Sequence, residues 1–121
     1  MSLDVSIWRT ELRRGLVELC VLSVLRDGEA YGYQIVEQLK QHANLDFTES
    51  TVYPVLARLH RDRYLSERRV RSEFGPPRRY FCLTASGRKR LDEMVLQWNE
   101  VSDRVSQLIE KGVASCRQLP L

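Results

Sequence analysis

Residues 65–87 read LSERRVRSEFGPPRRYFCLTASG, and this stretch decides the fold class. Segments 65–71 and 79–83 are typical of two short strands, because a loop containing glycine and two prolines separates them. The strand pattern stops at Thr84, and a helical pattern follows. Thr84 or Ser86 is expected to cap that helix, since hydroxyl side chains favour the N-cap position. We therefore predict a β-hairpin that leads directly into a helix.

Three helical patterns precede the hairpin, over about 10–25, 32–42 and from Thr48 or Ser50 to about Arg63. Each carries apolar residues at helical spacing, which are Leu12, Leu16, Leu19 and Val24, then Ile35, Val36 and Leu39, then Val52, Val55, Leu56 and Leu59. Three helices followed by a hairpin is the order of a winged helix-turn-helix, whose third helix enters the major groove of DNA. The predicted fold class is therefore mainly α, with a small two-stranded β-wing.

The C-terminal segment has the clearest periodicity in the chain. Apolar residues step by three and four along it, at Leu91, Met94, Trp98, Val101, Val105 and Leu108. A single stripe of this kind on a long helix favours pairing with a partner helix across a two-fold axis. The alternative is that the helix packs back on its own domain. We predict a C-terminal dimerisation helix.

The length of 121 residues fits one domain with an appended element. The pattern divides the chain into an N-terminal arm over 1–9 and a DNA-binding domain over 10–85. The dimerisation helix follows over 86–115, and a tail occupies 116–121.

Residues 58–90 contain eleven cations and three anions, a local net charge of +8, whereas the rest of the chain carries −5. Ten of the eleven cations are arginine, whose planar fork suits phosphate and base edges. One concentrated cationic region in a mildly charged protein indicates a polyanion partner. A solvated charged face is the alternative.

Other features of the sequence exclude several classes of protein. It has no apolar run long enough to cross a bilayer and no secretory signal pattern, so we expect a cytoplasmic protein with no membrane partner. Cys20, Cys82 and Cys116 have neither disulfide nor metal-ligand spacing, and Cys20 is expected to be buried and inert. His42 and His60 have no catalytic or ligand neighbours in the sequence. We therefore expect no enzyme activity, no metal site and no cofactor.

The third helix and the hairpin carry the chemistry that DNA binding requires. A helix that enters a groove needs small, hydrogen-bonding residues near its N-terminus, and Ser50, Thr51 and Tyr53 supply two hydroxyls and a phenol there. Arg58 lies further along the same helix. The wing supplies Arg78 and Arg79 after a stiff Gly-Pro-Pro sequence.

Three motifs resemble the PadR-type transcriptional regulators. They are the segments 31–35 (YGYQI), 50–59 (STVYPVLARL) and 75–88 (GPPRRYFCLTASGR), and the resemblance covers about residues 11–111. It implies a homodimer that binds a near-palindromic operator in double-stranded DNA, usually as a repressor. It also implies release by a small aromatic or drug-like effector.

Transferred position by position, the resemblance implies a set of DNA contacts. These are Tyr33 and Gln34 at the start of the second helix, Ser50, Thr51, Tyr53, Arg58 and Arg61 on the recognition helix, and Arg78 and Arg79 on the wing. Partial burial within the domain is the alternative for the two tyrosines.

The sequence departs from the family at the end of the recognition helix, where Arg63 replaces the usual glycine. If the backbone keeps a left-handed conformation there, a non-glycine residue costs about 1 kcal/mol. The C-terminal helix is also short, which is similar to the compact branch of the family.

Trp98 occupies a seam position of the last helix, where two copies could approach each other across a dimer. Paired indoles would suit a flat aromatic effector by stacking. We assign Trp98 and Val101, with Leu16 of the first predicted helix and Trp8 just before that helix, as candidate effector contacts. The alternative is that Trp98 packs against the first helix.

A second class of function is also compatible with the pattern. The winged helix could serve as a protein-interaction adaptor without regulatory DNA binding, because a basic face can also meet an acidic protein.

Overall fold

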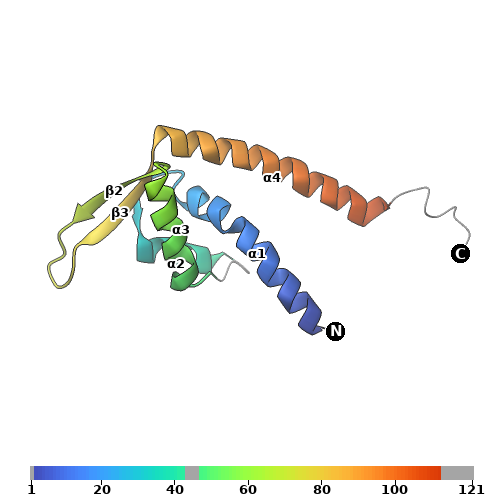
Figure 1. Cartoon of the computed structure of the whole chain (residues 1–121), viewed down its shortest axis with the longest axis horizontal. Helices are drawn as coiled ribbons and strands as arrows, with labels where there is room; N and C mark the ends of the chain where they lie inside the picture. The colour runs from blue at the N-terminus through green and yellow to red at the C-terminus, as the bar shows by residue number, and fades with distance from the viewer. Residues whose placement is uncertain (1, 43–46, 113–121) are drawn as a thin grey trace, which may run out of the picture. The chain divides into compact units, whose positions relative to one another are not determined.

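The computed structural model describes residues 2–42 and 47–112. Its elements are α1 (Ser2–Val24), β1 (Ala30–Tyr31), α2 (Gly32–Gln41), α3 (Glu49–Arg61), β2 (Leu65–Val70), β3 (Arg78–Leu83) and α4 (Ala85–Lys111), as Figure 1 shows. The chain divides into two compact units, Met1–Leu91 and Asp92–Leu121. The first two turns of α4 therefore belong to the first unit and the remaining turns to the second.

The core of the first unit lies where α1, α2 and α3 meet, since each of these helices contacts the other two. The predicted apolar stripes of α2 and α3 are buried, apart from Val55, which is half-buried. On α1 the buried positions are Val17, Val21, Leu22 and Leu25 just beyond the helix end. Leu12, which was predicted to face inward, is exposed. No charged or polar residue among those described is buried.

A small antiparallel sheet extends from this core. The β2–β3 hairpin pairs from Leu65 opposite Leu83 to Val70 opposite Arg78, close to the predicted bounds. The sheet has a third strand that the sequence did not predict, because β1 is only two residues long. It pairs with β3 and places Tyr31 opposite Tyr80, so the strand order is β1-β3-β2.

The first helix begins much earlier than predicted. The segment over 1–9 was predicted to be an arm, but α1 starts at Ser2. Residues 2–9 include neither glycine nor proline, so a helix nucleated further along can propagate towards the N-terminus. The Thr10 hydroxyl supports this by donating to the Ser6 carbonyl at 3.1 Å.

The end of α3 has the left-handed turn that was considered for Arg63. Its φ is 66°, the one positive value at a non-glycine among the described residues. The Arg63 amide donates to the His60 carbonyl at 3.0 Å, and the Tyr64 amide donates to the Leu59 carbonyl at 2.9 Å. This pair of bonds is the Schellman motif, which satisfies the last carbonyls of a helix.

The start of α4 is bonded to that same turn. The Thr84 hydroxyl and the Ser86 hydroxyl both donate to the Arg63 carbonyl, at 2.7 and 3.0 Å. The Thr84 amide donates to the Tyr64 carbonyl at 3.1 Å. Thr84 also acts as the predicted cap, because its hydroxyl accepts the Gly87 amide at 3.0 Å.

Two expectations for the last helix need correction. The helix was predicted to reach residue 115, but α4 ends at Lys111 because Gly112 adopts a left-handed φ of 61°, a common helix stop. Residues 113–121, with the predicted tail, lie outside the described residues. Leu91 was assigned to the dimer seam, but it is 2% exposed within the first unit and so cannot meet a partner.

The described helices include none that is both long and apolar enough to cross a membrane.

We predict that Gly87→Ala destabilises the protein by at least about 2 kcal/mol, because overpacking against rigid backbone is costly. A Cβ at Gly87 would lie 1.9 Å from the Tyr64 carbonyl oxygen, so the start of α4 would have to move. Thermal unfolding followed by circular dichroism measures the loss.

Gly15→Ala is the matched control, because a Cβ at this exposed helical position meets nothing within 4 Å. It should gain about 0.5–1 kcal/mol through the better helix propensity of alanine. An unchanged melting temperature for Gly87→Ala would contradict the close approach.

Candidate nucleic-acid interface

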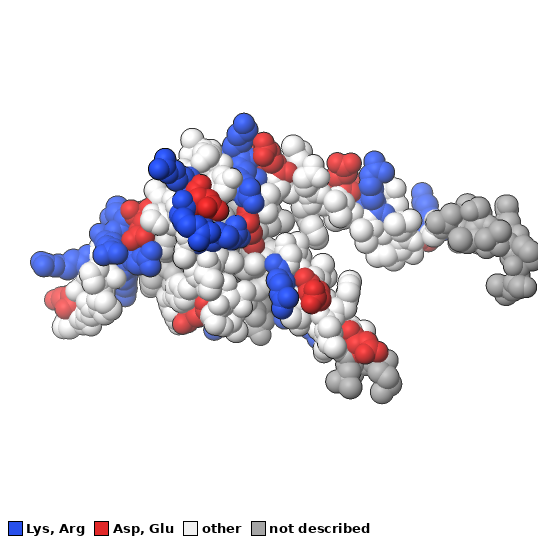
Figure 2. Space-filling view, in the orientation of Figure 1, with Lys and Arg blue, Asp and Glu red and all other residues white. Residues whose placement is uncertain are grey.

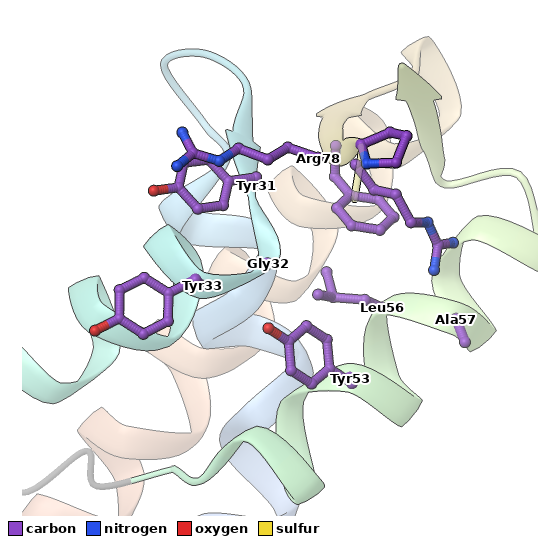
Figure 3. Close-up of a pocket in the computed structure, with 10 residues that line it drawn as sticks. Tyr31, Gly32, Tyr33, Tyr53, Leu56, Ala57 and Arg78 are labelled. Carbon is purple, nitrogen blue, oxygen red and sulfur yellow. The ribbon is translucent and has the colours of Figure 1, made fainter. Parts of the chain in front are cut away.

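A hollow opens between the start of α2, the first half of α3 and the beginning of β3 (Figure 3). Its floor is apolar and its rim carries phenols and guanidinium groups. The lining residues are Tyr31, Gly32, Tyr33, Tyr53, Leu56, Ala57, Pro77, Arg78, Arg79 and Phe81. The structure therefore brings together Tyr33, Tyr53, Arg78 and Arg79, four of the nine residues predicted to contact DNA.

Tyr53 is held against the backbone of α2. A Cβ on Gly32 would lie 2.4 Å from Cε1 of Tyr53, so the phenol ring crosses a position that only glycine leaves open. Burial, and secondarily the nearby Glu49 carboxylate, raise the pKa of Tyr53. Its hydroxyl is a donor that lines the hollow.

The N-terminus of α3 presents Ser50 and Thr51 to solvent. Thr48 is the N-cap residue, as one of the two predicted choices. Its hydroxyl lies 2.9 Å from the Ser50 hydroxyl and 3.3 Å from the Thr51 hydroxyl. Three hydroxyls thus form one exposed polar cluster at the end of the helix where groove contacts are expected.

Tyr33 and Gln34 occupy the start of α2 but differ in what they can offer. Tyr33 is 52% exposed and lines the hollow. The Gln34 side-chain oxygen accepts the Tyr31 amide at 3.1 Å, so it already closes the first turn of its own helix.

The wing arginines Arg78 and Arg79 are held by different chemistry. The guanidinium carbon of Arg78 lies 4.7 Å from the ring centroid of Tyr31, a cation–π contact. Arg79 donates instead to Glu67 Oε2 at 2.7 Å. Among the described residues, Arg78 has no carboxylate partner.

Glu67 is the centre of a charged cluster on the hairpin. Besides Arg79, it accepts from Arg69 at 3.2 Å and lies 3.8 Å from His60 Nδ1. The Arg79 hydrogen bond and the other cations lower the pKa of Glu67 to about 2, against a smaller opposing effect of burial. This cluster ties the end of α3 to both strands of the wing.

The predicted phosphate contact at Arg58 is not supported by its position. Arg58 donates to Glu18 Oε1 at 2.9 Å, and Arg90 donates to the other oxygen of the same carboxylate. Burial alone would raise the pKa of Glu18, but the two arginines hold it below its usual value. Arg58 therefore binds α3 to α1, whereas Arg61 is exposed with only a 3.6 Å contact to Asp62.

Figure 2 shows lysine and arginine side chains gathered over the β2–β3 hairpin and around the start of α4. Part of this charge is already neutralised, because Glu18, Glu29 and Glu67 each pair with arginine. Sequence analysis missed these three acids, and it missed Tyr31. The register of β1 with β3, which no local sequence pattern records, places Tyr31 beside the wing.

The other assigned residues are exposed or half-buried within their own units. In the second unit, Trp98, Val101, Val105 and Leu108 are all exposed, and Met94 is half-buried. In the first unit, Trp8 is exposed and Leu16 is half-buried.

Cys20 is half-buried rather than fully buried, and burial raises the pKa of its thiol, as expected for an unreactive cysteine. Cys82 is exposed, and Cys116 lies outside the described residues. Within the described part of the chain, no three His, Cys, Asp or Glu side chains are grouped to hold a metal ion.

Three packed helices, a basic hairpin and a polar third-helix N-terminus define a winged helix-turn-helix protein. The family model of the PadR-like transcriptional regulators matches residues 21–93. The chain belongs to that family, whose members are transcriptional regulators and not enzymes.

The chain is similar to solved structures of this family. A PadR-family regulator from Eggerthella lenta is 35% identical and aligns over 89% of this chain and 94% of its own, with a TM-score of 0.80. A PadR-like transcription factor from Bacteroides fragilis is 37% identical over 82% of this chain and 95% of its own, with a TM-score of 0.70. Bacillus subtilis PadR in complex with operator DNA shares the fold at 24% identity, over 66% of this chain and 46% of its own, with a TM-score of 0.61.

We predict that Glu67→Gln lowers stability at neutral pH and that this difference disappears in acid. Because the pKa of Glu67 is lowered to about 2 in the folded state, its ion pairs stabilise the protein above about pH 4.5. That contribution is lost as the pH falls towards 2. The urea midpoints of the wild type and the variant, measured across this range, should converge.

Glu73→Gln is the control, because Glu73 is exposed on the wing loop and forms no ion pair with a described residue. Its midpoint should follow that of the wild type throughout. A deficit of Glu67→Gln that stays constant down to pH 2 would refute the role assigned to this carboxylate.

Proposed function

We propose that this chain is a regulator that binds double-stranded DNA through α3 and the β2–β3 wing. The observation that carries the proposal is the hollow shared by Tyr33, Tyr53 and Arg78, beside the exposed hydroxyls of α3. A helix in the major groove and a wing on the adjacent backbone need donors on both elements. The DNA complex of the Bacillus subtilis relative supports this use of the fold.

The proposed contacts differ in the part of the DNA that they bind. Ser50, Thr51 and Tyr53 are proposed near base edges and phosphates, because they project from the exposed N-terminal half of α3. We propose that Arg61, Arg78 and Arg79 bind phosphates. Tyr33 and the side-chain amide nitrogen of Gln34 are proposed to contact the DNA backbone. Phosphate contacts set the register, and base contacts set the sequence preference.

We further infer a homodimer formed through the second unit. Trp98, Val101, Val105 and Leu108 leave an apolar stripe exposed on α4, and such a stripe is normally covered by a partner. A two-fold dimer presents two recognition helices and therefore reads a near-palindromic operator. The proposed role is repression in the cytoplasm.

A small aromatic effector is proposed to release the protein from DNA. The exposed indoles of Trp98 and Trp8, with Val101 and Leu16, are the proposed contacts, since flat aromatic compounds stack on indole. Quenching of the indole fluorescence by such a compound tests this, and a spectrum unchanged at millimolar compound would exclude it.

The first prediction from this function concerns salt. With roughly six to ten phosphate contacts per dimer, affinity for a mixed-sequence duplex should fall about 10³–10⁵-fold between 50 and 200 mM salt. Arg78→Ala with Arg79→Ala should weaken binding to all duplexes alike and reduce the salt slope by about two to four. Fluorescence anisotropy of a labelled duplex measures both.

Arg9→Ala with Arg14→Ala removes the same number of charges from exposed positions on α1, and it should leave the salt slope nearly unchanged. If the wing variant kept the wild-type affinity and slope, the wing assignment would be wrong. A monomer with no duplex affinity at low salt would favour the adaptor function instead.

The second prediction concerns assembly. Val105→Glu places a charge in the exposed stripe of α4 and should convert the dimer to a monomer at micromolar concentration, because a buried unpaired charge opposes association. Multi-angle light scattering gives the mass. Gln107→Glu adds the same charge at an exposed position outside the stripe and should remain a dimer. Equal masses for the two variants would contradict the proposal that this stripe forms the dimer interface.

A further inference from the structure

Two arginines flank a pair of aromatic rings across the three-stranded sheet that carries the wing. Arg78 lies over the ring of Tyr31 at 4.7 Å, and Tyr31 meets the ring of Tyr80 edge-on, with centroids 5.4 Å apart. Arg68 lies 5.3 Å from the centroid of Tyr80 on the neighbouring strand, and it is paired with Glu29. The row therefore runs from the wing arginine to a fixed ion pair at the start of β1.

Tyr31 is fixed at its place in this row by backbone contacts at both sides. It pairs with Tyr80 in the sheet register, and its amide donates to the Gln34 side chain of α2. The ring is thus anchored both to β3 of the hairpin and to the first turn of α2. Figure 3 shows the Arg78 side chain extending from the wing to this ring.

A ring holds an arginine differently from a carboxylate. Glu67 accepts one N–H of Arg79 and offsets part of its charge. The ring of Tyr31 lies under the Arg78 guanidinium carbon and accepts no hydrogen bond from it, and no hydrogen bond joins the Arg78 side chain to another described residue, so its N–H groups remain available to donate. Arg78 is therefore restrained while it keeps both its charge and its donors.

We propose that Tyr31 is a positioning residue that holds Arg78 ready to bind a DNA phosphate. The inference rests on the proposed DNA-binding function. A side chain ordered before binding loses less conformational freedom when the complex forms, so the benefit is realised as affinity. Tyr31 itself need not touch the DNA.

The experiment compares Tyr31→Leu, Tyr31→Phe and Arg78→Ala in the full-length chain, with the Tyr31→Leu, Arg78→Ala double variant. Affinity for a labelled mixed-sequence duplex is measured by anisotropy across a salt series. The Tyr31→Leu variant should bind the duplex about two- to fivefold more weakly for each wing. This factor corresponds to the loss of one exposed cation–π contact. Tyr31→Phe keeps the ring and should bind like the wild type.

Two readouts separate positioning from a direct contact or a folding defect. Tyr31→Leu removes no charge, so its salt slope should match that of the wild type, whereas Arg78→Ala should reduce the slope. In the Arg78→Ala background, Tyr31→Leu should cause no further loss, because the group it positions is absent.

Tyr64→Leu is the matched control, because Tyr64 forms the same kind of contact with Arg90, also at 4.7 Å. Arg90 is bound to Glu18 and is not a proposed DNA contact, so this variant should keep the duplex affinity. Thermal unfolding of each variant confirms that the comparison is made on folded protein.

The outcomes distinguish the two proposals. If Tyr31→Leu binds like the wild type, or if its effect multiplies fully with that of Arg78→Ala, Tyr31 does not position Arg78 and only this inference is overturned. If the wild type itself binds no duplex at low salt, the proposed function fails and this inference fails with it.

Discussion

The joint between the end of α3 and the start of α4 is the constraint on which the rest of the first unit depends. Arg63 turns left-handed, and its carbonyl accepts the hydroxyls of Thr84 and Ser86. The neighbouring Tyr64 carbonyl approaches so closely that only glycine fits at position 87. Because β2 and β3 run between these two points, the joint closes the hairpin at its base and fixes where the wing leaves the recognition helix.

Electrostatics within the first unit divide the arginines into two groups. Glu18, Glu29 and Glu67 pair with arginines, which joins α1 to α3, the residue before β1 to β2, and β2 to β3. The strong local charge of residues 58–90 is therefore not all available to a polyanion, since part of it contributes to cohesion. Among the arginines assigned to DNA, Arg78 and Arg61 are the least neutralised by carboxylates. Where an arginine lies is therefore a better guide to DNA binding than the number of arginines.

Sequence reasoning succeeded where the signal is local. The stripes of α2 and α3, the hairpin and the Thr84 cap all follow from spacing within a few residues. It failed where partners are distant, because Glu18 pairs with arginines 40 and 72 residues away and no local pattern records that. The strand β1 was missed for the same reason, since two residues become a strand only through their pairing with β3. Arg63 is intermediate: the resemblance located the turn, and the structure supplied its hydrogen bonds.

Tyr31 and Gly32 explain why the proposed DNA contacts of α3 and the wing converge at the start of α2. The ring of Tyr31 lies under Arg78 of the wing, and the bare backbone of Gly32 lies under Tyr53 of α3. Tyr31 contributes an aromatic ring, and Gly32 has no side chain. The wing and α3 can therefore both approach the start of α2. Substituting either would alter a contact of a different element. The arrangement of α3 and the wing around the hollow is therefore set by the last residue of β1 and the first residue of α2, two elements that carry few of the proposed DNA contacts.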